Sequence, residues 1–154
     1  MAVIGRRDYV ALLMAGLLFP RLGRSDQSSD LRDIVQQIAT SLTDENPADA
    51  MGPFSRSFNN YDKLRDYFEG LTGSYQIVNV VTLGDEQDDP GQTTATLSWT
   101  LTLSDKTNPG AQDSRHREIH VRLVREKKHW KIVEFSPIEL FDPQFRVKSG
   151  NPPQ

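Results

Sequence analysis

The chain of 154 residues contains no cysteine and has only three histidines. The absence of cysteine excludes disulfides, thiol nucleophiles and cysteine-ligated zinc. His116 and His120 are four residues apart in a predicted strand, which separates their backbones by about 13 Å. Two imidazoles at that separation do not share one metal ion, and His129 belongs to the turn that follows. We therefore expect no metal site and no cofactor.

The sequence also lacks a strong excess of charge. Its formal net charge is −3, and four arginines against one aspartate give residues 1–24 a net charge of +3. Residues 25–154 therefore carry a net charge of −6, because the two parts together make −3. A mildly acidic body does not supply the positive surface that binding to phosphates needs, so no nucleic-acid partner is expected.

No hydrophobic run is long enough to cross a membrane. The longest apolar segment, Tyr9 to Phe19, would rise only about 16 Å as a helix, about half of a bilayer core. A basic start followed by such a run is typical of a signal peptide, and no stable membrane span is expected. Arg6 and Arg7, followed by a variable residue and then apolar residues, resemble the twin-arginine export signal of bacteria.

We therefore expect residues 1–24 to be a signal peptide and the protein to be exported, periplasmic or envelope-associated in a bacterium. Whether the signal is cleaved stays open, because no clear small-x-small site precedes Ser25. The alternative is that these residues form an ordinary buried first helix or follow a wrongly assigned start.

Helical periodicity governs the first half of the remaining chain. After an expected linker at residues 25–29, an apolar stripe with helical spacing begins, and Asp30 is a plausible N-cap. A short helix is expected from Pro47, and a third helix from about Asn60 to Leu71, closed by Gly70 and Gly73. The first stripe consists of Leu31, Ile34, Val35, Ile38 and Leu42.

From Ser74 the period changes from 3.6 to 2, which predicts strands. The expected strands are residues 74–83, 93–104, 118–125 and 130–140, with an acidic turn region at 84–92. In the second strand one face is apolar and the other is a row of hydroxyls. The apolar face consists of Ala95, Leu97, Trp99, Leu101 and Leu103.

This order predicts an α+β domain over residues 30–142, followed by a disordered tail at 143–154. Two to three N-terminal helices pack on a curved antiparallel sheet of about four strands, which gives a cone with an apolar interior.

The segments "NPADAMGPFSRSFNNYDKLRDYFEGL" and "VRLVREKKHWKIVEF" resemble the nuclear transport factor 2-like superfamily, which has a cystatin-like fold. The resemblance covers residues 30–142 and is closest to small exported bacterial members. It implies the cone-shaped fold, but not one function, because enzymes and non-catalytic binding domains both use this fold.

Enzymes of this superfamily place an acid or base and a tyrosine inside the cone. Here the inward positions of the second and third strands carry no titratable group, so we assign no catalytic residue. Glu134 shares the parity of Trp130 and Ile132 and is the one acidic candidate on the last strand, unless a bulge turns it outward. The candidates for lining a ligand pocket are Tyr61, Tyr67, Leu97, Trp99, Leu101, Val121, Trp130 and Glu134.

Two functions remain open from the sequence, beside a third option, a purely structural envelope protein whose cone is filled by its own side chains. The first is an exported, non-enzymatic domain that binds an apolar small molecule or a protein partner and forms a homodimer through the outer sheet face. The alternative is an isomerase or cyclase that uses Glu134, Tyr61 or Tyr67. His116, His120 and Arg122, with Arg115 and Arg117 nearby, are expected to form a basic patch at one end of the sheet. This patch is either a solvated face that pairs with the acidic turn at residues 85–89 or a docking site for an anionic partner. The candidates for the dimer face are Thr96, Ser98, Thr100, His120 and Arg122.

Overall fold

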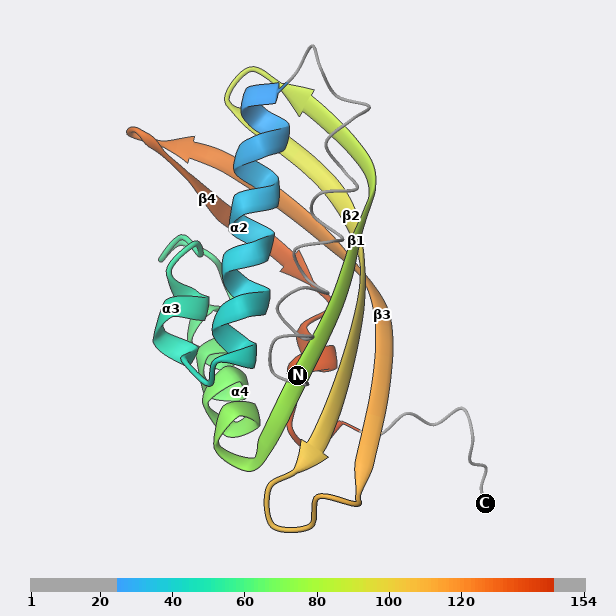
Figure 1. Cartoon of the computed structure of the whole chain (residues 1–154). Helices are drawn as coiled ribbons and strands as arrows, with labels where there is room; N and C mark the ends of the chain where they lie inside the picture. The colour runs from blue at the N-terminus through green and yellow to red at the C-terminus, as the bar shows by residue number, and fades with distance from the viewer. Residues whose placement is uncertain (1–24, 146–154) are drawn as a thin grey trace.

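The computed structural model describes residues 25–145, so the expected signal peptide and the end of the chain lie outside the described residues. Within these residues three helices precede a four-stranded antiparallel sheet of order β1-β2-β3-β4, and the helices lie together on one side of it (Figure 1). The predicted α+β class is confirmed. The elements are α2 (Ser25–Thr43), α3 (Pro47–Met51), α4 (Tyr61–Ser74), β1 (Tyr75–Asp89), β2 (Gln92–Asp105), β3 (Gln112–Glu126), β4 (His129–Ser136) and the 3-10 helix η2 (Ile138–Phe141).

Helix α2 begins earlier than the sequence indicated. Residues 25–29, expected as a linker, form its first turns. The side-chain amide of Gln27 donates to the carbonyls of Asp89 and Gln92 and to the Thr93 hydroxyl. These bonds dock the start of the helix on the β1–β2 hairpin, a tertiary contact that local polarity does not reveal. No helix within residues 25–145 is long and apolar enough to cross a membrane.

The two shorter helices follow the predicted pattern, with one difference. Asn46 caps α3 through its side chain, and Pro47 opens the helix. Helix α4 continues through Gly70 and Gly73 to Ser74, although these glycines were expected to end it. Close packing explains why residue 70 is a glycine, because a Cβ there would lie 2.7 Å from Cγ of Pro143.

Strand β1 is longer than expected, because the acidic segment forms strand rather than turn. It pairs with β2 as far as Asp89, and a register shift between Leu83 and Glu86 marks a bulge. The turn proper is Pro90-Gly91, and Gly91 has a φ of 75°. Pairing with β2 therefore overrides the low strand propensity of the acidic residues.

The last two strands also differ from their expected bounds. Strand β3 begins at Gln112 instead of residue 118. Strand β4 ends at Ser136, because Pro137 has no N–H to donate, and Ile138–Phe141 turn back as η2. The tight turn between β3 and β4 lacks glycine and places Lys127 at a φ of 57°.

The helices and the inner sheet face enclose the hydrophobic core. The apolar parity of β2 is fully buried, as its alternation predicted. The ring of Trp99 packs edge-on against Phe135 and Phe141, with centroids 6.0 and 5.4 Å away. Phe54 and Phe68 extend this aromatic cluster toward the helices.

The disordered tail was expected to begin at residue 143, but the first residues after η2 pack against the domain. Arg115 is 1% exposed and reaches out of β3 to this segment. Its guanidinium donates to the carbonyls of Leu140, Asp142 and Pro143 and lies over the ring of Phe145. Residues 143–145 are therefore held against the domain, and the remaining tail residues lie outside the described part of the chain.

Candidate functional site

The inward residues proposed as pocket lining belong to the core. Leu97, Trp99 and Leu101 are fully buried, and Val121 is 3% exposed. Their side chains join one continuous hydrophobic cluster. These side chains therefore form part of the packed core, and none of them supplies a titratable group.

A buried amide, which was not among the residues expected from the sequence, organises the interior. Asn79 is fully buried on β1 and accepts a hydrogen bond from the Trp99 indole at 2.9 Å. Its own NH₂ donates to the Ala39 carbonyl at 3.0 Å and to the Thr43 hydroxyl at 3.1 Å. The signal was present in the sequence, because Asn79 interrupts the inward parity between Ile77 and Val81.

The two tyrosine candidates lie on α4 and face the aromatic cluster only in part. Tyr61 and Tyr67 are half-buried and pack against the edge of the core. A cationic side chain lies over each ring. The Arg56 guanidinium carbon is 4.5 Å from the centroid of Tyr61, and the Lys63 Nζ is 5.9 Å from the centroid of Tyr67. These contacts occupy the rings at the surface of the helix layer.

Glu134 lies on the outer face of the sheet rather than inside the cone. The register between β3 and β4 shifts, so that Arg122 pairs with Glu134 while Leu123 pairs with Ile132. Val133 is the extra residue, and it reverses the parity on which the inward prediction rested. The structure therefore does not bring Glu134 together with the tyrosines of α4.

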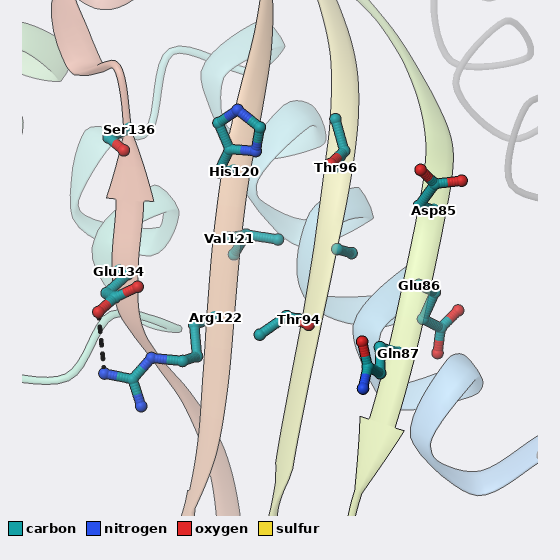
Figure 2. Close-up of a pocket in the computed structure, with 11 residues that line it drawn as sticks. Asp85, Glu86, Gln87, Thr94, Thr96, His120, Val121, Arg122, Glu134 and Ser136 are labelled. Atoms are coloured by element: carbon teal, nitrogen blue, oxygen red, sulfur yellow. Dashed lines mark hydrogen bonds and ion pairs between the residues drawn. The ribbon is translucent and has the colours of Figure 1, made fainter.

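The outer face carries a shallow hollow of about 350 Å³ around Glu134 (Figure 2). Asp85, Thr96, His120 and Ser136 lie in one row across the four strands, each from a different strand. In the next row Glu134 accepts a bond of 3.0 Å from the guanidinium of Arg122. The hollow thus combines carboxylates from β1 and β4 with an imidazole and a guanidinium from β3.

The residues proposed for self-association share this outer face. Thr96, Ser98 and Thr100 are half-buried on β2, and His120 is exposed beside them on β3. Ser98 and His116 are joined by a hydrogen bond of 2.8 Å. Within the row, the Ser98 hydroxyl is therefore already engaged with a side chain of β3.

Two further features of this face concern β1 and β3. Val78 and Val80 of β1, half-buried, pair with Thr102 and Thr100 and add apolar surface beside the hydroxyls. Arg115, expected in a basic surface patch, points into the protein instead. Its position on the inward parity of Ile119 and Val121 was the available signal.

The titratable groups of the interior are few within the described residues. The buried polar side chains are Arg32, Ser41, Ser55, Thr72, Asn79, Thr93 and Arg115, with no carboxylate or imidazole among them. Across residues 25–145 no group of three or more acidic, histidine or cysteine side chains is placed to hold a metal ion.

Comparison with known proteins places this architecture in a recognised class of fold. No family model and no curated protein matches the sequence. A conserved protein from Planctomyces limnophilus is similar over 73% of this chain and 94% of its own, with a TM-score of 0.68 and 7% identity. A ketosteroid isomerase-like protein from Erwinia carotovora atroseptica is similar over 71% and 93%, with a TM-score of 0.60 and 6% identity.

A nuclear transport factor 2-like superfamily protein from Salmonella enterica serovar Typhimurium is similar over 70% of this chain and 88% of its own, with a TM-score of 0.55 and 9% identity. The chain therefore has the nuclear transport factor 2-like fold. At these identities the likeness defines the fold and leaves the chemistry to the residues present.

Proposed function

We propose that the protein is a non-catalytic binding domain that associates with a second copy of itself through the outer face of its sheet. The observation that carries this proposal is the composition of that face. It joins half-buried hydroxyls on β2, apolar Val78 and Val80 on β1, and an array of charged groups on β3. Such a surface supports association without a large exposed apolar patch.

The face is complementary to itself under two-fold symmetry. A two-fold axis parallel to the strands, placed between β2 and β3, sets β2 of one copy against β3 of the other. Thr96 and Thr100 then meet His116 and His120 of the second copy. Hydroxyls both donate and accept, so they can pair with imidazole and carboxylate groups alike.

The interior supports a binding role over catalysis. Acid–base isomerisation needs a base and a proton donor within reach of one substrate. Glu134, the acid candidate of the alternative hypothesis, lies on the outer face and is paired with Arg122. The inner face presents Trp99 with its indole bound to Asn79.

Sedimentation equilibrium of the purified protein tests self-association directly. We expect a dimer at micromolar concentration, and the Thr100→Arg variant should shift the equilibrium to monomer because it buries a charge at the centre of the interface. Asn59→Arg, at an exposed turn on the helix side, adds the same charge and should leave the dimer intact. A wild-type protein that stays monomeric at high micromolar concentration would remove the proposal.

We also propose that residues 1–24 direct the protein out of the bacterial cytoplasm through twin-arginine export. The support is the pair Arg6-Arg7 ahead of an apolar run too short for a membrane span. The Arg6→Lys/Arg7→Lys double variant should remain in the cytoplasmic fraction while the wild type is found in the periplasm or envelope. Identical fractionation of the two proteins contradicts this proposal.

A further inference from the structure

A groove of about 520 Å³ opens between α2 and the β3–β4 hairpin, on the helix side of the sheet. It lies apart from the outer face proposed for self-association. Its lining includes Ile34 of α2 and Trp130 of β4, which are both half-buried. This volume is in the range of small-molecule sites in proteins.

The charges of the groove are divided between its two sides. Asp30 and Asp33 come from α2, one helical turn apart, whereas Arg125 and Lys128 come from the hairpin. In the described part of the chain no hydrogen bond or ion pair joins the two sets. The opposite charges therefore face the same open space without neutralising each other.

The hairpin side presents a cation held on an aromatic ring. The guanidinium of Arg125 lies over the ring of Trp130 at 5.6 Å, and its backbone N–H is fixed by the carbonyl of Gly91. The neighbouring Lys131 is anchored by a bond of 2.8 Å to the Gly52 carbonyl. Among the side chains that the structure describes, no carboxylate pairs with Arg125, so its fork of donors is available to a carboxylate from outside.

Trp130 contributes an unsatisfied polar group to this region. Its indole Nε1 is buried and has no hydrogen-bond partner among the described residues. A buried donor without a partner destabilises the protein by about 1–3 kcal/mol. In contrast, the other indole, that of Trp99, is fully paired with Asn79.

We propose that this groove binds a short peptide, or a similar dipolar organic molecule, with an apolar body. Its carboxylate lies toward Arg125 and Lys128, and its ammonium group lies toward Asp30 and Asp33. The apolar body packs on Trp130 and Ile34. This orientation matches each ligand charge to the side of the groove with the opposite charge.

The two tryptophans allow a direct test with the full chain labelled with ¹⁵N, because each gives one indole N–H signal. The probes are the dipeptide phenylalanyl-leucine with free ends, its N-acetyl form, its C-amide form and the form blocked at both ends. We expect the free dipeptide to shift the Trp130 signal saturably and each blocked form to bind more weakly. The Trp99 signal should stay in place, which reports that the core is unchanged.

Charge-neutralising variants assign the two ends of the ligand. Arg125→Gln should weaken binding of the free dipeptide about tenfold and leave the C-amide form unaffected, because that form has no carboxylate. Asp33→Asn should weaken the free dipeptide and leave the N-acetyl form unaffected. The matched control Glu69→Gln removes an exposed charge from α4 and should change neither.

Three results would overturn the assignment. The first is a Trp130 signal unmoved by all four probes at 20 mM, a concentration at which even millimolar affinity saturates the site. The second is equal affinity for the free and doubly blocked dipeptides, which would mean that charge has no part in binding. The third is equal affinity for the free and N-acetyl forms, which would leave a simple anion site. All three are independent of the oligomeric state.

Discussion

Replacing Arg115 by methionine should lower the free energy of unfolding more than any surface substitution on the same strand does. Arg115 is 1% exposed, and its Nη1 donates to the carbonyls of Leu140 at 2.9 Å and Asp142 at 2.7 Å. Its Nη2 reaches the Pro143 carbonyl at 3.3 Å, and its Nε pairs with Asp113 at 2.9 Å. One side chain therefore ties the segment after η2 to β3.

The size of the effect follows from these contacts. Methionine keeps the apolar stem but removes every donor, so the buried carbonyls of the η2 segment lose their partner. Hydrogen bonds from a charged group contribute about 1.5–3 kcal/mol each but are not additive, and breaking a buried charged network costs about 3–5 kcal/mol. We expect Arg115→Met to lower the free energy of unfolding by about 3–5 kcal/mol, within this range.

Urea unfolding followed by tryptophan fluorescence measures this difference, because Trp99 packs on Phe141 of the anchored segment. Arg117→Met is the matched control, since Arg117 is exposed two residues along and should change stability by less than about 1 kcal/mol. Arg115→Lys should recover only part of the loss, because an ammonium group cannot reproduce the fork. An Arg115→Met protein within 1 kcal/mol of the wild type would refute the anchoring role.

Further predictions concern other buried or close contacts. Asn79→Val should lower the free energy of unfolding by about 1–3 kcal/mol in the same urea assay, because it leaves the Trp99 indole N–H without a partner; a loss below about 1 kcal/mol would contradict this. Gly70→Ala should destabilise α4, where a Cβ meets Pro143 at 2.7 Å, whereas Gly73→Ala, with nothing within 4 Å, should stabilise it by about 0.5–1 kcal/mol; the reverse order of melting temperatures would refute this. Bonds from the Thr107 hydroxyl and backbone N–H lower the pKa of Asp105, so this stabilisation is present above the ordinary carboxyl pKa and is lost as the pH falls through the lowered value. Thr107→Val should therefore raise the Asp105 pKa in an NMR titration and reduce stability at neutral pH but not in strong acid; an unchanged pKa would contradict the hydroxyl's role.

Periodicity predicted those parts of the fold in which neighbouring residues alternate without interruption. The stripe of α2 and the parity of β2 are both found as expected, since each reflects burial against a single core. The position of Pro47 likewise predicted the start of α3. These features are local, so a short window of sequence contains the whole signal.

The parts that failed depend on contacts distant in the sequence. The acidic end of β1 forms strand because β2 pairs with it, and the start of α2 forms because Gln27 reaches the β1–β2 hairpin. Arg115 lies within a run of polar and charged residues that reads as surface, although η2 supplies buried carbonyls for it. None of these three distant partners can be located from the residues near β1, the start of α2 or Arg115.

The interior and the candidate site are linked by one inserted residue. Val133 is the extra residue in β4, and it turns Glu134 outward to Arg122 and Phe135 inward to Val121. Phe135 then packs against Trp99 and Phe54 inside the core. The same bulge therefore removes the carboxylate from the cone and supplies an aromatic ring to its core. Among the described residues, polar and charged groups instead line two hollows outside the core, one on the outer face of the sheet and the other beside Trp130.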